Sequence, residues 1–539
     1  MKPRLTGQAK STGALFLAIL LLLVGLGSAP SLAESPYSEG GWATLHRSGA
    51  NRRFAGDVPL SGSYRRWQAL EGASVLTAPT LAPGGQRFYV TTGQGKGAPN
   101  LHAFSIQGEL LWQAEPWRDA ESGVDPCAIL SSAIVDREGN VYIGDCNQLF
   151  AFRPDGRLKW VVPLPAPQRG DWQPSETLPI NAFTTAVFTR EGHVAGITNF
   201  GDVVVVDRAT GRALTAPNRL PGLLPPPSAA VPMATSVFGD GLMAEEIREW
   251  AWQLLFGGHM RSANTPAVDE ASGRIFVAAT STNEGLGALY ALDLVSTRGA
   301  DGAGFAARGA GAPLTIRIAH ATDMGPGSGS SPALSPDGRH VYVSDEEGVF
   351  YAIDAREGGI VWQVETKSTA AAAAVGGDGT IYSLQADGPA LVAISPGGEI
   401  AWESDLSRLT TERLPSSWLL GDPVALGNGN PTVLSDRILV PVIYGYETRI
   451  GRRIPWPVDS TVVAIDAATG EGLIDVVALP DDSTGITVAL PDGTLINSLG
   501  TALTSGVRPL APVARWLLPG GLEPLPAVGG IQVSRPQAR

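Results

Sequence analysis

The chain is poor in charged residues, in cysteine and in long apolar segments. Acidic and basic residues make up 17% of its 539 residues, whereas soluble domains usually contain about 25%. There are two cysteines and six histidines. After the apolar run at 14–26, no later stretch is long and apolar enough to span a bilayer. A hydrophobic content of 44% still supplies a sizeable core, which excludes wholesale disorder.

The chain also lacks any excess of positive charge. It contains 39 basic and 52 acidic residues, a formal net charge of −13. Residues 1–33 hold Lys2, Arg4 and Lys10 and no acid, so the remainder is more acidic still. A surface of this sign repels phosphate backbones, and general nucleic-acid binding is therefore excluded.

Motifs for common catalytic chemistry are missing as well. No two histidines lie at metal-ligand spacing, and no Gly-x-Ser-x-Gly sequence occurs. We therefore assign no catalytic residue and no metal ligand from the sequence.

Residues 1–33 have the pattern of a secretory signal peptide. A basic start precedes the apolar run at 14–26, and small residues then allow cleavage after Ala33. An uncleaved membrane anchor is the alternative. The sequence predicts an exported mature chain from about residue 34, which would be periplasmic or secreted.

Glycine and proline are abundant, with 66 and 42 residues. Both residues mark turns, and many turns imply many short elements, which favours an all-β fold. The segment from Ala352 to Trp362 reads Ala-Ile-Asp-Ala-Arg-Glu-Gly-Gly-Ile-Val-Trp, and Ala464 to Ile474 repeats its pattern. Each copy predicts a strand, a glycine turn and a second strand.

A second predicted hairpin precedes each of these copies. Asp-Gly turns between β-prone runs occur at 337–338, 378–379 and 492–493, and this dipeptide is a strong hairpin signal. Two hairpins make a four-stranded unit, and the 40 residues from Trp362 to Trp402 match one propeller blade.

Nine positions equivalent to Trp362 bound eight intervals, so the sequence predicts an eight-bladed β-propeller over residues 34–520, with seven blades as the alternative. The nine positions are Trp67, Trp112, Trp160, Thr215, a weak one near Ile318, Trp362, Trp402, Ile474 and Trp516. Their regular spacing indicates that the tryptophans pack between blades. We expect the strand around Trp67 to pair with strands from 482–518 and close the ring.

Long intervals mark insertions. Residues 216–262 contain a proline run and then a short amphipathic helix at 242–256, where Met243, Ile247, Trp250 and Leu254 follow helical spacing. Residues 444–458 are predicted to form a loop, and residues 521–539 a C-terminal tail.

Two of these insertions are candidate interaction sites. The candidate side chains are aromatic or basic, as is common at binding hot spots: Trp250, Trp252, Phe256, Arg452, Arg453 and Trp456. For the helix the competing interpretation is simple docking onto the propeller.

Cys127 and Cys146 flank a predicted hairpin, which brings such positions together. We expect a disulfide between them, because an exported protein meets an oxidising compartment.

The pattern Ala-x-Asp-x-x-Thr-Gly-x-x-x-Trp resembles the tryptophan-docking repeat of the pyrroloquinoline-quinone (PQQ) propeller family. Ala352 to Trp362 matches it apart from Glu357 at the threonine place, and the resemblance covers about residues 42–518. One branch of that family comprises dehydrogenases that hold PQQ and Ca²⁺ in the central funnel, usually beneath a disulfide between adjacent cysteines. This chain has no adjacent cysteines.

The other branch of the family comprises exported, non-catalytic propellers that bind proteins. The lipoprotein member of that branch carries a lipid-anchor cysteine that this chain lacks.

The resemblance favours an exported, non-catalytic propeller without a cofactor, which binds an envelope protein or a small ligand through its rim loops and funnel. One alternative is a PQQ- and Ca²⁺-dependent dehydrogenase acting on alcohols or sugars. Another is a polysaccharide-binding or envelope-structural protein.

Overall fold

Short antiparallel strands joined by glycine-containing turns account for most of residues 36–537, which belong to one compact unit in the computed structural model. The structure describes residues 34–39, 41–224, 233–256, 258–297, 314–327, 329–368, 372–385, 389–450, 452–483 and 485–537. Among these residues no helix combines the length and the apolar character needed to cross a bilayer. The predicted signal peptide at 1–33 lies outside the described residues.

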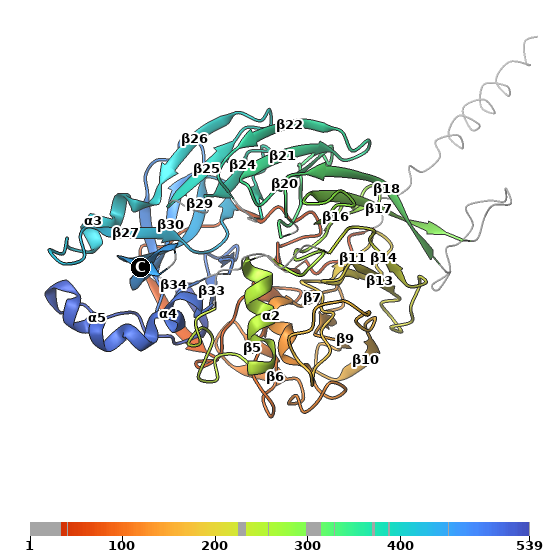
Figure 1. The fold of residues 1–539 in the computed structure, drawn as a ribbon, viewed down its shortest axis with the longest axis horizontal. Coiled ribbons are helices and arrows are strands. Elements are labelled where there is room, and N and C mark those ends of the chain that lie inside the picture. The colour runs from red at the N-terminus through yellow and green to blue at the C-terminus, as the bar shows by residue number, and fades with distance from the viewer. Residues whose placement is uncertain are drawn as a thin grey trace, which may run out of the picture. The chain divides into compact units, whose positions relative to one another are not determined.

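The strands form eight sheets, which confirms the eight-bladed propeller and rules out seven blades. Figure 1 shows the blades following one another around a centre. Blades one to three comprise β3 (Thr80–Leu81), β4 (Arg87–Thr91), β5 (Leu101–Ser105) and β6 (Leu110–Gln113); β7 (Ile134–Val135), β8 (Val141–Gly144), β9 (Gln148–Phe152) and β10 (Leu158–Pro163); and β11 (Val187–Phe188), β12 (Val194–Ile197), β13 (Asp202–Val206) and β14 (Asn218–Arg219). Blades four to six comprise β15 (Ala267–Val268), β16 (Ile275–Thr280), β17 (Gly287–Ser296) and β18 (Leu314–Met324); β19 (Ala333–Leu334), β20 (His340–Ser344), β21 (Val349–Asp354) and β22 (Ile360–Glu365); and β23 (Ala374–Val375), β24 (Ile381–Leu384), β25 (Ala390–Ile394) and β26 (Ile400–Asp405).

The last two blades differ from this plan. Blade seven contains β28 (Thr432–Leu434), β29 (Arg437–Ile450), β30 (Arg452–Asp466) and β31 (Ile474–Ala478), and is widened by β1 (Phe54–Gly56), parallel to β28, and β27 (Pro423–Gly427), antiparallel to β29. Blade eight contains β32 (Val488–Ala489), β33 (Leu495–Leu499), β34 (Gly530–Pro536) and β2 (Tyr64–Ala69). The helical segments are η1 (Pro126–Leu130), α2 (Glu245–Phe256), η2 (Leu406–Leu409), α3 (Thr410–Arg413), α4 (Ala502–Val507), η3 (Arg508–Leu510), α5 (Ala511–Leu517) and η4 (Pro519–Gly521).

Ring closure uses a strand that the sequence did not predict. Strand β2 pairs along its whole length with β34, and Trp67 lies opposite Val533. Residues 530–536 therefore belong to the propeller and not to a C-terminal tail. The expected contribution from 482–518 is also present, because β32 and β33 complete the same sheet.

The repeated tryptophans pack between neighbouring blades, as the sequence predicts. Trp112 lies so close to the next blade that a Cβ added to Gly156 would be 2.7 Å from its ring. Its Nε1 also donates a hydrogen bond to the carbonyl oxygen of Pro154, at 3.0 Å. Trp160 and Trp362 make equivalent hydrogen bonds to the blades that follow them. Glycine is therefore required at these turns both by the close ring and by its positive φ.

Of the two weakest tryptophan-equivalent positions, the one expected near Ile318 is found two residues away, and the one at Trp516 is wrong. In blade four, His320 lies opposite Ala291 and packs on Gly358 of the next blade, so His320 occupies the place expected near Ile318. Trp516 lies on α5 and is 83% exposed, so it packs between no blades.

The antiparallel order of the strands gives the ring two different faces. Turns between the first and second and between the third and fourth strands of each blade share one face, which we call the hairpin face. The remaining turns and the connections between blades share the opposite face, which we call the connector face. The segments containing α2, α3 and α5 all interrupt connector-face links.

On the hairpin face, residues 37–39 and 41–56 form what we call the axial segment, which crosses the inner strands. Backbone N–H groups of the inner strands of blades one, two, four, five, six and seven donate hydrogen bonds to its carbonyl oxygens, and blade three bonds to the Tyr37 hydroxyl. The bonds from Leu81 to Trp42 and from Val375 to Arg52 are 2.6 and 2.8 Å long. The segment therefore ties seven blades together.

Candidate functional site

The predicted amphipathic helix is present as α2, within a segment of residues 233–256 that we call the cap. Its apolar face is buried: Ile247 and Trp250 are 0% and 1% exposed, and Trp252 is 8% exposed. These side chains pack with Trp117 and Leu178, which lie in connections between the first three blades. The helix is thus docked onto the connector face, near the centre of the view in Figure 1.

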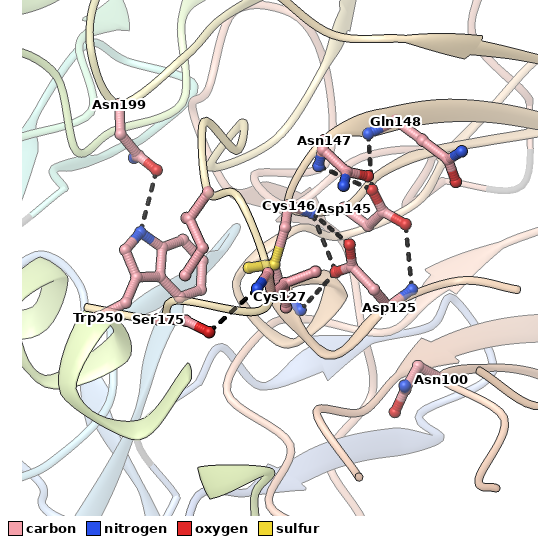
Figure 2. Close-up of a disulfide and its surroundings, with 12 residues drawn as sticks. Asn100, Asp125, Cys127, Asp145, Cys146, Asn147, Gln148, Ser175, Asn199 and Trp250 are labelled. Carbon is pink, nitrogen blue, oxygen red and sulfur yellow. Dashed lines mark hydrogen bonds between the residues drawn. A yellow bond between two sulfur atoms is a disulfide. The ribbon is translucent and has the colours of Figure 1, made fainter. Parts of the chain in front are cut away.

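Polar contacts fix the cap in the same position. The Trp250 Nε1 donates a hydrogen bond to the Oδ1 of the buried Asn199, at 3.2 Å (Figure 2). The backbone N–H of Ala244 donates to the carbonyl oxygen of Gly93, at 2.6 Å. Trp250 and Trp252 therefore present no indole face to a partner here, and the side chain of Phe256 lies outside the described residues.

Beneath the cap, Cys127 and Cys146 form the disulfide predicted from the sequence, with their Cα atoms 4.9 Å apart. Two buried carboxyl groups accompany it (Figure 2). The backbone N–H groups of both cysteines donate to Asp125, and the Asp125 N–H donates to Asp145. Burial and the neighbouring Asp145 hold the pKa of Asp125 well above its usual range, and burial raises the pKa of Asp145 to about 6. The two aspartates therefore fix the backbone on both sides of the disulfide through these hydrogen bonds.

A second insertion differs from its prediction. Residues 444–458, expected to be a loop, continue β29 and β30 as a long hairpin in which Tyr446 lies opposite Trp456. Pro455 and Pro457 disfavour a strand in the sequence, because proline has no backbone N–H to donate to a neighbouring strand. Trp456 is 5% exposed, so its indole is internal. The side chains of Arg452 and Arg453 lie outside the described residues.

This hairpin is the centre of a structure that we call the platform, formed by residues 406–427, 440–450, 452–458 and 502–522. Leu414, Tyr446, Trp456, Ala514 and Leu518 share its hydrophobic cluster. The platform stands on the connector face beside blades seven and eight, and Figure 1 shows α3, β27 and α5 on that side of the ring.

Two tryptophans on the platform face solvent. Trp418 is 91% exposed and Trp516 is 83% exposed, the largest values among the large hydrophobic side chains that the structure describes. Further partly exposed apolar side chains accompany them, namely Leu419, Leu510 and Val513. On α5, Ala514 is fully buried, so the helix packs one face and leaves the Trp516 face open.

The turn that carries Trp418 is held firmly. Ser417 and Gly421 exchange two backbone hydrogen bonds, each 2.8 Å long. The Ser417 hydroxyl also accepts a hydrogen bond from the backbone N–H of Leu420, at 3.1 Å. A fixed turn therefore presents the Trp418 indole, which limits the entropy that would be lost on binding. Trp418 is not among the residues predicted from the sequence, and its position outside every repeat, in Ser-Ser-Trp-Leu-Leu, was the available signal.

A second buried acid pair anchors the platform to blade eight. Asp482 accepts a hydrogen bond from the backbone N–H of Leu503, at the start of α4, and Asp481 accepts one from the Thr504 hydroxyl, both at 2.6 Å. Burial and the neighbouring Asp481 raise the pKa of Asp482 to about 8. The acids therefore stabilise the helical connection that positions α5.

The potential metal ligands that the structure brings together do not suit Ca²⁺. Among the described residues, one group of three potential ligands has its ligand atoms within 4.8 Å of one another, namely Asp125, Cys127 and Cys146. Both sulfurs belong to the disulfide, and Ca²⁺ takes six to eight oxygen ligands. The cysteines are also separated by 19 positions rather than adjacent.

Comparison with known proteins agrees with the fold. The family described as "Outer membrane protein assembly factor BamB" matches residues 59–230 and 317–471, which is more than half of the chain. No curated protein matches the chain.

Many solved structures are similar, among them the following three. Quinohemoprotein alcohol dehydrogenase ADHIIG from Pseudomonas putida HK5 is 14% identical, with a TM-score of 0.55, over 93% of this chain and 81% of that one. The corresponding enzyme from Comamonas testosteroni is 14% identical, with a TM-score of 0.55, over 94% and 82%. BamB from Moraxella catarrhalis is 14% identical, with a TM-score of 0.48, over 89% and 100%. At this identity the two dehydrogenases show a shared fold and nothing about activity.

Proposed function

The chain belongs to the propeller family described as outer membrane protein assembly factor BamB, and from this premise we propose that it is an exported, non-catalytic propeller that binds a partner protein through its platform. The predicted signal peptide and the disulfide support export, because disulfides persist in oxidising compartments. The compartment would be the periplasm or the exterior.

The observation that carries this proposal is the exposure of Trp418 and Trp516. An indole buries roughly 150–250 Å² when it is covered, and tryptophan is enriched among the residues that dominate binding energy. The other tryptophans of the repeats pack between blades, so exposure at these two positions is not a general property of the chain. Both tryptophans lie on the platform, and large exposed apolar surface on a folded protein is typical of interaction sites.

The coverage of the ring also supports a site at the rim rather than in the funnel. The cap packs over connections between blades one, two and three on the connector face. The axial segment crosses the inner strands on the hairpin face. A protein partner can reach the platform without displacing either segment.

The test is site-specific photocrosslinking in the native cell envelope. A photoreactive amino acid at position 418 or 516 should give one shared crosslinked partner, and the same label at Val361, a 50%-exposed position on β22, should not. Capture of this partner should be lost in a Trp418→Ala/Trp516→Ala variant and retained in Val361→Ala. Equal crosslinking from all three positions would contradict the proposal.

The dehydrogenase alternative has its own test. Purified protein is mixed with PQQ and Ca²⁺, and the quinone absorption spectrum and dye-linked oxidation of alcohols are recorded. We expect no stoichiometric uptake, because the cysteines are not adjacent and the one cluster of potential ligands in the described residues does not suit Ca²⁺. Stoichiometric uptake with turnover would overturn the non-catalytic assignment. Platform-dependent retention on an envelope polysaccharide, with no protein crosslink, would instead favour the polysaccharide-binding alternative.

A further inference from the structure

The axial segment buries a complete guanidinium group. Arg53 is 0% exposed, whereas its neighbour Arg52 is partly exposed, so the two side chains point to opposite sides of the segment. The backbone of Arg53 is bonded on both sides: its N–H donates to the carbonyl oxygen of His46, and its own carbonyl oxygen accepts from Val433 of blade seven. The side chain is therefore directed into the interior of the ring, beside the inner strands of blades six and seven.

No described residue neutralises this charge. The Nε and both Nη atoms of Arg53 are buried and donate no hydrogen bond to any described atom, and no described carboxylate forms an ion pair with the group. A guanidinium cannot lose its proton under ordinary conditions. Burial lowers the pKa of Arg53 to about 9, which still leaves the group charged at neutral pH. An isolated buried charge is strongly destabilising unless it is paired.

Other hydrogen-bond donors lie on the same segment. His46 is 2% exposed, and neither ring nitrogen has a partner among the described residues. Burial, followed by the positive charge of Arg53, holds the pKa of His46 well below its usual range, so the ring is neutral and carries one N–H. The hydroxyl of Thr44 is likewise buried and unpartnered. The segment thus carries several buried donors and one fully buried positive charge, whereas its other two arginines, Arg47 and Arg52, are partly exposed.

Backbone strain is concentrated in the same stretch. Asn51 and Arg53 both have left-handed backbone conformations, with φ values of 57° and 55°. The Asn51 Nδ2 donates to the carbonyl oxygens of Thr265, Pro266 and Pro332, which belong to blades four and five. Non-glycine residues keep such conformations only where the surroundings fix them, and they cluster at functional sites.

We propose that the axial segment binds one small monovalent anion, such as chloride, against the Arg53 guanidinium. The choice of a monovalent anion follows from the buried charge: Arg53 is the one fully buried cation of the segment, so a single negative charge neutralises it and a dianion would leave an excess. The choice of a small anion follows from the complete burial of the Arg53 side chain, which is not open to solvent. The anion would fasten the axial segment to the ring that it crosses.

The first experiment uses wild-type protein, so it does not depend on whether a variant folds. Crystals are grown with bromide as the only halide, and anomalous scattering is measured at the bromine edge. We expect a single internal bromide peak within hydrogen-bond distance of the Arg53 nitrogens. Ordered water at this position, with no anomalous peak, would overturn the proposal.

The second experiment measures thermal unfolding at constant ionic strength while gluconate is replaced by chloride. A ligand that binds only the folded state raises the unfolding midpoint as its concentration rises. We expect that rise in wild type and in Arg52→Met, the matched control on the same segment, and its loss in Arg53→Met. An equal response in Arg53→Met would contradict the proposal. Partner capture by the platform should be unaffected by anion exchange, so the two proposals can fail separately.

Discussion

The cap and the platform are two insertions on the same face of the ring, and they use tryptophan in opposite ways. Trp250 of the cap is 1% exposed, and Trp516 of the platform is 83% exposed. Each residue lies on a short helix. The difference is that the cap lies across the connections of three blades, whereas α5 packs one face on the platform cluster and no described residue covers the Trp516 side chain on the other. The cap is therefore part of the core, and the platform presents a surface.

The largest effect is expected from removing the buried indole of the cap. Trp250→Ala removes a buried indole and leaves a cavity, which should lower the free energy of unfolding by about 3–5 kcal/mol. Denaturant unfolding measures this loss, and Trp250→Phe, which leaves a smaller cavity, should lose less. The folded fraction should still capture the platform's partner. A loss below about 0.5 kcal/mol, the range of ordinary surface substitutions, would mean that the cap is not docked in solution.

Removing the disulfide beneath the cap should have the next largest effect. The bond closes a loop with a sequence separation of 19, and loss of this constraint should destabilise the protein by about 3 kcal/mol. Chemical unfolding of Cys127→Ala/Cys146→Ala, compared with wild type under oxidising conditions, gives the value. Crosslinking from position 516 should be unchanged, because the disulfide lies outside the platform. A stability equal to that of wild type would show that the loop needs no covalent closure.

Substitutions at the exposed tryptophans of the platform should weaken partner binding and leave stability nearly unchanged. Trp418→Ala and Trp516→Ala should each change the free energy of unfolding by no more than about 0.5 kcal/mol, because the side chains contact solvent. Each should weaken partner binding by about 2 kcal/mol, or about 30-fold, as is typical of aromatic hot spots. Calorimetric titration with the crosslinked partner measures the loss, and Val361→Ala is the exposed control. A variant that unfolds instead would show that the indole is structural.

The smallest effect concerns the acid pair that anchors the platform. Because the pKa of Asp482 is raised to about 8, the folded state binds a proton that the unfolded chain has released above about pH 4. Stability should therefore fall as the pH rises toward 8, with a slope of at most about 1.4 kcal/mol per pH unit for one proton. Asp482→Asn should reduce the slope between pH 7 and 8, and Asp436→Asn, at a 79%-exposed side chain, should leave it unchanged. Identical slopes in all three proteins would contradict this prediction.

The blades were predictable because their signals are local. An Asp-Gly turn and the interval between two tryptophans each report on neighbouring residues, and Trp362 packs where its spacing implied. Strand β34 was missed because its partner β2 is more than 450 positions away and no tryptophan marks it. The axial segment was also missed. Its hydrogen bonds are made to seven different blades, and no local sequence pattern indicates those contacts.

The candidate surface was less predictable than the fold. Residue type directed attention to tryptophans in the insertions, but the ones that it favoured, Trp250, Trp252 and Trp456, are internal. Whether an indole meets solvent depends on what packs above it, and that is decided by the arrangement of distant segments. Trp516 is an example: its spacing in the sequence matched that of a blade position, but it lies on helix α5, outside the blades.

Blade eight has a consequence for how the protein is made. Its sheet combines residues 64–69 with residues 530–536, so no nascent fragment that stops short of position 530 contains a sealed ring. Until residues 530–536 have been synthesised, blade one has no complete neighbour on one side. Closure of the ring is therefore a late step in folding. A nonsense mutation that removes only the final strand should consequently act on the entire molecule, leaving a protein that misassembles or is degraded.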